Sequence, residues 1–322
     1  MEALLDPVVL FFALGVFAAL MKSDLKVPGS FYQTLSIYLL LSIGIKGGIE
    51  LSHNSFSQIV APSAGTLLLG IVITLIAFTI LLKLGKFDNT NAVAIATHYG
   101  SVSAVTFAVA LSYLKNLNVA YESYSTVLLV MLEIPSIAVG IVLARVGGRT
   151  KGAAPLKLKA ILHEVFFGKT ILLLLGGMAI GLVTGYTHNV AINSFFLDLF
   201  KGFLCFFMLE MGIVSAGRIK DLKKVGAFLL GFGLIMPLIS ALLGVCIASL
   251  TGLSVGGSFI LATMAASASY IAAPAAMKIA LPEANPTLSL TASLGITFPF
   301  NVLVGIPLYY QLTQFLYPLL NG

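Results

Sequence analysis

Long apolar segments separated by short polar ones cover almost the whole chain. Divided at glycine, proline and charged residues, the sequence gives ten apolar segments, most of them near the ~20 residues that a helix needs to cross a bilayer. They cover residues 7–21, 31–46, 61–82, 91–114, 124–145, 169–187, 194–216, 225–250, 256–280 and 289–317. This pattern predicts an all-α integral membrane protein with ten transmembrane helices.

The composition agrees with this prediction and excludes a soluble domain. Of the 322 residues, 59% are hydrophobic and 9% are charged, whereas soluble domains carry about 25% charged residues. The net charge of +6 comes from basic residues scattered over short loops, so the sequence lacks the basic face of a nucleic-acid-binding protein. Cys205 and Cys246 both lie in apolar segments and have no metal-ligand spacing.

The distribution of lysine and arginine predicts the orientation in the membrane. If both termini lie outside the cell, fifteen of the eighteen basic residues fall on the cytoplasmic side. Lys46 and Lys115 then fall on the outer side, and Lys201 lies within a span. Because basic residues are enriched in cytoplasmic loops, we expect a multi-pass protein with both termini outside.

The second half of the chain repeats the first at a shift of 165 residues. This shift lays residues 31–141 over residues 196–306 without a gap, and Gly47 falls on Gly212. Five spans in each unit is an odd number, so the second unit is inverted relative to the first. Inverted repeats are typical of secondary transporters that work by alternating access.

The repeat divides the chain into three parts. Residues 1–145 are the first five-helix repeat, residues 146–168 are a cytoplasmic linker, and residues 169–322 are the second five-helix repeat. We therefore predict a 5+5 inverted-repeat fold.

Two spans at equivalent positions of the repeat carry small and polar residues at mid-depth. These residues are Gly100, Ser101, Val102, Ser103 and Thr106 in the first span, and Ser267, Ala268, Ser269 and Tyr270 in the second. Such runs also serve as ordinary helix-packing surfaces, but their presence in both halves favours a substrate site. We predict that both helices break there and that hydroxyl groups and half-helix N-termini bind a small anion.

An acidic residue inside a span is costly and usually marks an ion pathway. Glu133 lies in the middle of the segment 124–145 and precedes a proline by two residues. We expect Glu133, with Thr97 and Ser269, to bind or relay the coupling ion.

Two further polar residues allow more than one interpretation. Glu210 either belongs to an ion pathway or forms a salt bridge with Lys201 or Lys46. His98 either titrates near neutral pH or is simply hydrogen-bonded.

The sequence carries no P-loop, no HExxH motif and no cluster of cysteine and histidine. It also lacks a cytoplasmic nucleotide-binding domain. We therefore expect a protein that is not an enzyme, binds no cofactor apart from a coupling ion, and uses an ion gradient.

Several segments resemble the sodium-dependent bicarbonate transporter family, the bacterial bicarbonate permeases. They are Ile45-Lys46-Gly47-Gly48-Ile49, Gly100-Ser101-Val102-Ser103, Glu133-Ile134-Pro135, Met208-Leu209-Glu210-Met211-Gly212, Pro282-Glu283-Ala284-Asn285-Pro286 and Gly305-Ile306-Pro307-Leu308. Their order and spacing together carry the resemblance, which covers nearly the whole chain.

The resemblance implies ten helices in a core and a gate subdomain, assembled as a homotrimer in the bacterial inner membrane. Spans 3–5 and 8–10 would form the core, with bicarbonate between the broken spans 4 and 9 and a sodium ion beside it. Symport of bicarbonate and sodium is the implied activity. A PII-like cytoplasmic protein is the implied regulator.

Two features depart from the family pattern. Tyr270 stands where the family has an aspartate, and Ala273 stands where it has a glycine. The linker between the repeats is also shorter than in familiar members. The alternatives are a proton-coupled carrier of another small anion or carboxylate that uses Glu133 and His98, and a non-transporting membrane receptor.

Overall fold

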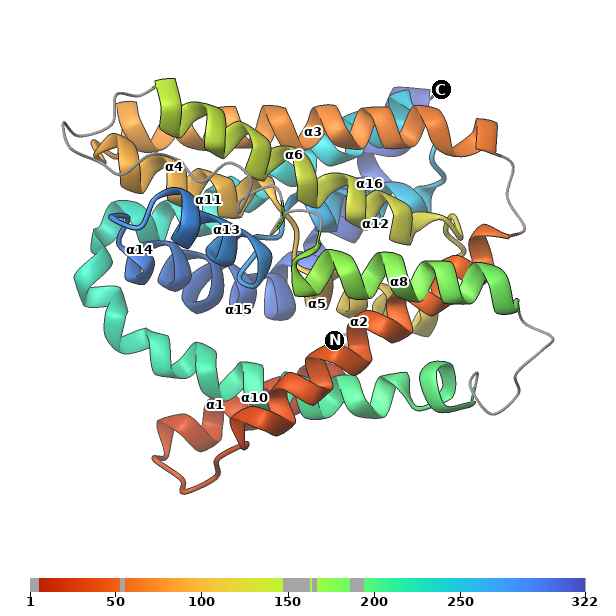
Figure 1. Cartoon of the computed structure of the whole chain (residues 1–322), viewed down its shortest axis with the longest axis horizontal. Coiled ribbons are helices and arrows are strands. Elements are labelled where there is room, and N and C mark those ends of the chain that lie inside the picture. Colours follow the sequence, from red (N-terminus) through yellow and green to blue (C-terminus); the bar gives the residue numbers. More distant parts are fainter. Residues whose placement is uncertain (1–5, 53–55, 147–162, 164–166, 186–193, 322) are drawn as a thin grey trace.

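The computed structural model describes residues 6–52, 56–146, 163, 167–185 and 194–321 (Figure 1). Every regular element among these residues is a helix. Most of the predicted linker, residues 146–168, lies outside the described residues.

The helices before the linker end at Val146. They are α1 (Pro7–Leu20), α2 (Gly29–Leu51), α3 (Phe56–Lys83), α4 (Asn89–Gly100), α5 (Ala104–Asn116) and α6 (Ser125–Val146).

The helices after the linker include several short π-helical and 3₁₀ turns. They are α8 (Lys169–Thr184), η2 (Ser194–Asp198), α10 (Phe200–Arg218), η3 (Ile219–Asp221), α11 (Leu222–Leu250), α12 (Val255–Ala265), α13 (Ala272–Ala280), α14 (Pro286–Leu290), η4 (Thr291–Thr297), α15 (Phe298–Phe300), η5 (Asn301–Gly305) and α16 (Ile306–Asn321).

Seven helical stretches in the described part of the chain are long and apolar enough to cross a membrane. They are Gly29–Leu51, Ser57–Lys83, Asn89–Asn116, Ser125–Arg145, Phe200–Arg218, Val225–Leu250 and Pro286–Asn321. Three shorter apolar helices, Pro7–Leu20, Lys169–Thr184 and Val255–Ala265, accompany them. The all-helical membrane fold is confirmed in this coarse form, whereas the count of ten spans remains a prediction.

Polar side chains fix where several helices begin. An oxygen of each capping residue accepts a hydrogen bond from a backbone N–H in the first turn, which satisfies a donor that has no partner within the helix. The capping residues are Asp6 for α1, Asp88 for α4, Ser103 for α5, Ser254 for α12 and Asn285 for α14.

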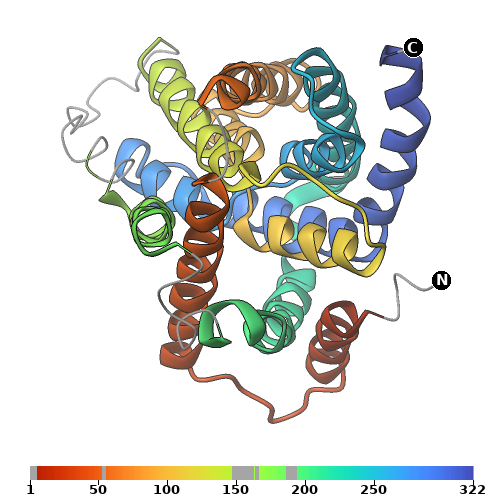
Figure 2. The same cartoon turned by 90° about the vertical axis from the view of Figure 1, so that its right-hand side faces the viewer.

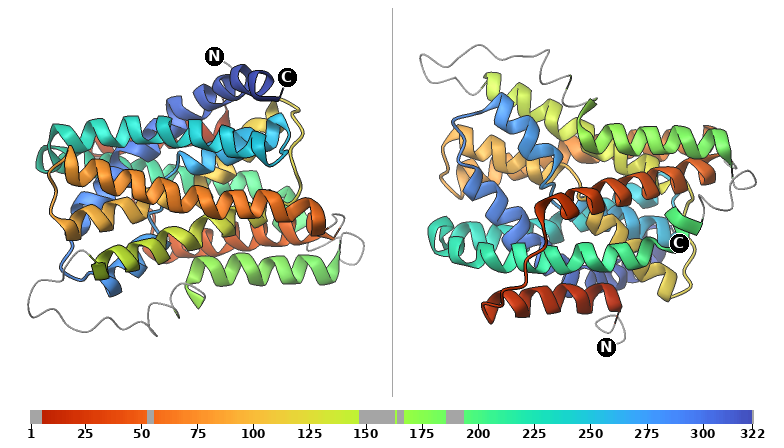
Figure 3. Two further views of the ribbon diagram at one scale, coloured as in Figure 1. Left: turned by 90° about the horizontal axis from the view of Figure 1, so that it is seen from above. Right: turned by 60° about the horizontal axis from the view of Figure 1, so that its bottom comes forward.

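The helices form two groups. Helices α1, α2, α8 and α10 lie together along one side of the molecule (Figure 2), with α2 packed on α8 and α1 packed on α10. The remaining helices form a bundle in which α3 packs on α4 and α6, and α11 packs on α12. The axes of α3, α8 and α11 are nearly parallel (Figure 3).

Glycines allow α2 and α8 to approach until their backbones touch. Gly44 and Gly48 face Gly177 and Gly181, so each helix presents two glycines four residues apart. A Cβ atom on Gly44 would lie 2.5 Å from the carbonyl oxygen of Leu174. This is the small-residue packing that holds helices together in lipid, where apolar burial drives little association.

Helices α1 and α10 also approach each other closely at glycines. A Cβ atom on Gly15 would overlap the carbonyl oxygen of Leu209, and one on Gly212 would overlap that of Phe12. Close backbone contact therefore stabilises both pairs on this side of the molecule.

Replacing Gly181 by leucine should destabilise the α2–α8 pair. The new side chain would overlap the backbone of Ile45, and overpacking of this kind costs about 1–3 kcal/mol. We expect a lower Tm in thermal unfolding followed by circular dichroism in detergent. Gly176→Leu is the matched control, because nothing lies within 4 Å of a Cβ at that position; equal losses in both variants would contradict the packing argument.

Candidate functional site

The helical path between α4 and α5 is interrupted at three residues. Ser101 is fully extended, with φ −95° and ψ −179°, and it is buried. Ser103 then begins α5, because its Oγ accepts a hydrogen bond of 3.1 Å from the N–H of Thr106. The extended segment exposes backbone groups that an unbroken helix would pair internally.

A second interruption separates α12 from α13. The Oγ of Ser267 donates to the carbonyl of Met264 at 2.7 Å. Further on, the N–H of Ala273 donates to the Oγ of Ser269 at 3.2 Å. Both serines are buried, so their hydroxyl groups replace water as partners for the local backbone.

The two interruptions meet in the interior. The N–H of Ser103 donates to the Oγ of Ser267 at 2.9 Å, and the Oγ of Ser103 donates to the hydroxyl of Tyr270 at 3.2 Å. The N–H of Ser269 donates to the carbonyl of His98 at 2.8 Å. Residues that the sequence places about 165 positions apart thus form one hydrogen-bonded cluster.

Four polar atoms near this cluster have no hydrogen-bond partner among the described residues: Nε2 of His98, Oγ of Ser101, and Oγ1 of Thr106 and of Thr263. All four residues are buried. Nδ1 of His98 lies 2.7 Å from the carbonyl of Ala94 and donates to it, so Nε2 of the neutral ring is an acceptor. Since buried polar atoms are normally paired, these atoms are candidates for contact with a ligand.

A supporting residue that the sequence did not single out is Asn301. Its Nδ2 donates to the carbonyl of Ala266 at 2.9 Å, and its Oδ1 accepts from the hydroxyl of Tyr309 at 2.7 Å. Asn301 therefore satisfies a carbonyl that the second interruption leaves unpaired. In the sequence, the position of an asparagine within an apolar span is the feature that could have indicated this role.

A second supporting chain joins three elements. The hydroxyl of Tyr99 donates to Oγ1 of Thr297 at 2.7 Å, and that Oγ1 donates to the carbonyl of Gly233 at 2.7 Å. Thr297 and Asn301 belong to the π-helical turns η4 and η5. Such turns are rare and occur often at functional sites.

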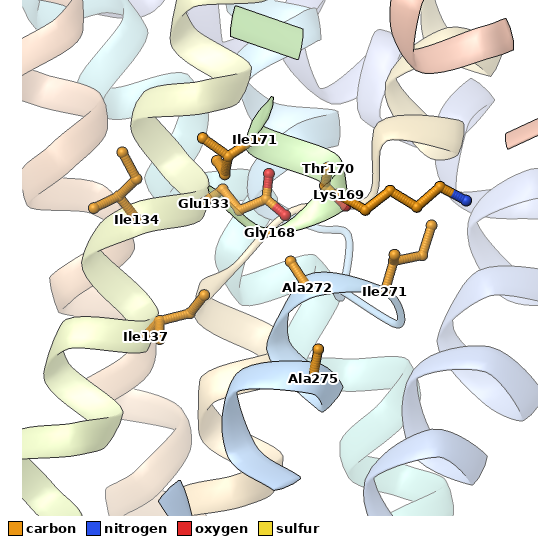
Figure 4. A pocket seen from close by; sticks show the side chains of 10 residues that line it. All are labelled: Glu133, Ile134, Ile137, Gly168, Lys169, Thr170, Ile171, Ile271, Ala272 and Ala275. Carbon is orange, nitrogen blue, oxygen red and sulfur yellow. The ribbon is translucent and has the colours of Figure 1, made fainter. Parts of the chain in front are cut away.

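Glu133 lies apart from the cluster, on a cavity of about 120 Å³. The start of α8 and the start of α13 form the other walls (Figure 4). The side chain is 2% exposed, and no hydrogen bond or ion pair joins its carboxylate to another described residue. The amine of Lys169 points away from this carboxylate (Figure 4).

The three residues predicted to hold the coupling ion have different partners in this structure. Thr97 donates to the carbonyl of Val93 at 2.8 Å and packs against Gly140. Ser269 belongs to the second interruption, and the cavity of Glu133 begins two residues later, at Ile271.

Neither lysine predicted as a partner for Glu210 pairs with it. Lys201 forms an ion pair with Asp6 at 3.3 Å, and Lys46 forms one with Glu50 at 3.7 Å. The interpretation of Glu210 as a salt-bridge residue is therefore wrong for the described part of the chain.

Long apolar helices around a buried polar cluster are typical of multi-pass membrane transporters. The family comparison is more specific. The chain belongs to the Na+-dependent bicarbonate transporter superfamily, whose family model matches residues 7–314. A search of curated proteins found no match.

Replacing Asn301 by alanine should destabilise the protein. The change leaves the carbonyl of Ala266 and the hydroxyl of Tyr309 buried without partners, at about 1–3 kcal/mol each. We expect a marked fall in Tm by circular dichroism. Asn321→Ala, on an exposed side chain at the end of α16, is the control, and an unchanged Tm for Asn301→Ala would refute the supporting role.

Proposed function

We propose that the protein is a secondary active transporter that imports bicarbonate by alternating access, coupled to a sodium gradient. The observation that carries the proposal is the meeting of the two helix interruptions through Ser103 and Ser267. It joins elements from both halves of the chain around buried hydroxyl groups. Membership of the superfamily supports the choice of bicarbonate and sodium.

The helix bounds support an inverted repeat of five plus five helices. A shift of 165 residues moves α4 onto residues 254–265, and α12 is Val255–Ala265. The same shift moves α3 onto residues 221–248, and α11 is Leu222–Leu250. The two units would be residues 1–145 and 169–322.

Contacts at the outer ends of the half-helices support the same symmetry. The N–H of Asn285 donates to Oδ1 of Asn91 at the start of α4, at 2.8 Å. The equivalent positions in the other unit are Ala120 and Gly256, and a Cβ atom on Gly256 would overlap the carbonyl of Ala120. A pseudo-two-fold relation of the two units accounts for both contacts.

The two helix groups supply the parts that alternating access needs. Helices α1, α2, α8 and α10 would be the gate, and the bundle with both interruptions would be the core. The homotrimer, the inner-membrane location with both termini outside, and the PII-like regulator rest on the family resemblance and on the distribution of charge.

Bicarbonate would bind where the buried hydroxyl groups lack partners. Ser101 and Thr106 offer O–H donors, and the start of α5 offers backbone N–H groups and the positive end of a helix. Ser103, Ser267 and Tyr270 are already bonded to each other, so the conformation described here has the interruptions closed on one another. Binding would exchange some of these bonds for bonds to the anion.

The surroundings of Glu133 favour a second candidate, a carrier coupled to protons. Hard cations such as sodium require several oxygen ligands. The cavity around Glu133 is lined mainly by isoleucine and alanine side chains and by the starts of two helices, which present N–H groups and repel cations. Within this cavity a proton suits the carboxylate better than a metal ion does.

Removing the hydroxyl that joins the interruptions should abolish most transport. Ser103→Ala removes the bond to the hydroxyl of Tyr270, and Ser267→Ala removes the acceptor of the Ser103 N–H. We therefore expect uptake of labelled bicarbonate into proteoliposomes to fall about tenfold or more in each variant, the equivalent of one or two hydrogen bonds. Ser30→Ala, on the exposed start of α2, should transport normally. Negligible wild-type uptake with and without a sodium gradient would refute the transport proposal, and ligand binding without flux would favour a receptor.

Replacing Glu133 by glutamine tests whether this residue takes part in coupling. The variant keeps the size of the side chain and loses its charge and its exchangeable proton. We expect bicarbonate uptake by Glu133→Gln to lose its response to the imposed cation gradient, whichever of sodium or pH drives the wild type. Glu283→Gln, on an exposed loop residue, is the control; a Glu133→Gln variant that still responds fully would exclude this residue from coupling.

A further inference from the structure

A second cavity, much larger than that of Glu133, lies between the two helix groups. Its volume is about 540 Å³, which is within the usual range for sites that bind organic ligands. One wall comes from α2, η2 and α10, and the other from α5, the start of α6 and the loop between them. An anion as small as bicarbonate would fill only a small part of it.

One wall carries an apolar stripe that ends in a cation. Phe107, Leu111 and Lys115 follow one another at intervals of four residues along α5, so they lie on one face. The stripe spans about 12 Å at the rise of an α-helix. Ser112 lies beside its charged end, and its Oγ has no partner among the described residues.

The opposite wall combines aromatic and apolar side chains with the charged residues Lys46, Glu50, Asp198 and Lys201. Phe196, Phe200 and Leu204 line it from η2 and α10. Aromatic rings in such a wall favour a flat apolar body through edge-to-face and offset contacts.

The charges around the cavity place the anionic end at Lys115. Lys46 is paired with Glu50 and also donates to the hydroxyl of Tyr121 at 2.8 Å. Lys201 is paired with Asp6. No ion pair joins Lys115 to another described residue, and its exposed amine lies at the end of the apolar stripe.

We propose that this cavity is a binding site for an amphipathic organic anion, an aromatic carboxylate whose ring lies between α5 and α10 and whose carboxylate meets Lys115 and Ser112. Binding itself is independent of transport. A consequence rests on the proposed function: because the walls belong to the gate and the core, an occupied cavity holds the two groups apart and inhibits uptake.

Binding of 4-phenylbutyrate to the purified full-length protein tests the proposal by calorimetry, without bicarbonate or sodium. The uncharged 4-phenylbutan-1-ol and acetate, which lacks the ring, are the comparison ligands. We expect 4-phenylbutyrate to bind more tightly than either, by up to ~fivefold over the alcohol, since a partly exposed ion pair contributes at most about that much in affinity. Equal affinity of the acid and the alcohol would overturn the assignment of an anion site.

Variants of the α5 stripe locate the site. Lys115→Gln and Leu111→Ala should each weaken 4-phenylbutyrate binding about fivefold, whereas Lys83→Gln, an exposed lysine at the end of α3 outside the cavity, should not. Unchanged affinity in both stripe variants would overturn the proposal.

Uptake of bicarbonate measured with external 4-phenylbutyrate distinguishes binding of the ligand from its effect on transport. Inhibition of bicarbonate uptake that weakens in Leu111→Ala supports the gate–core consequence. Tight binding without inhibition overturns that consequence and leaves the binding site in place. Absent wild-type uptake refutes the proposed transport function, while the calorimetric result still decides the binding site.

Discussion

Inside a bilayer, every backbone polar group must find its partner within the protein. An interrupted helix breaks this requirement locally, because its freed N–H and C=O groups face neither water nor their usual helical partners. In this chain each interruption is completed by the other half of the molecule: Ser267 accepts from the N–H of Ser103, and His98 accepts from the N–H of Ser269. The halves are therefore joined at the point where each would be least stable alone.

The remaining architecture follows from supporting these interruptions. Asn301 pairs with the carbonyl of Ala266, and Tyr309 fixes the orientation of Asn301. The π-helical turns place Thr297 and Asn301 where a regular helix would direct them differently. On the other side, α1, α2, α8 and α10 pack closely through glycines, with the ion pair of Asp6 and Lys201 beside the contact of α1 and α10.

The helical elements were largely predictable, because hydrophobic length is a strong signal for membrane helices. α1 is Pro7–Leu20 against the predicted 7–21. One difference at a helix end has a physical cause: α2 continues to Leu51 instead of ending at residue 46. Lys46 and Glu50, which suggest a helix end in the sequence, lie one turn apart on the same helix and neutralise each other.

The residues of the candidate site were predictable only where a single segment of the sequence contains several polar residues. The serine clusters stand out in the sequence, and the structure brings Ser103, Ser267 and Tyr270 together. The position of Glu133 beside the start of α8 could not be read from the sequence, since it depends on how distant helices pack. The same holds for Asn301, whose role is visible only once the carbonyl of Ala266 is known to lack a helical partner.

Tyr270 connects these observations. It occupies the position where the family resemblance places an aspartate, and its hydroxyl accepts from Ser103. A carboxylate at this depth would need a cation or a proton beside it. A neutral hydroxyl needs only a hydrogen-bond partner, so the closed contact between the interruptions forms without any bound ion. Glu133 is a buried acid that faces a cavity, and the start of α13 lines the same cavity, so an ion bound there would contact α13.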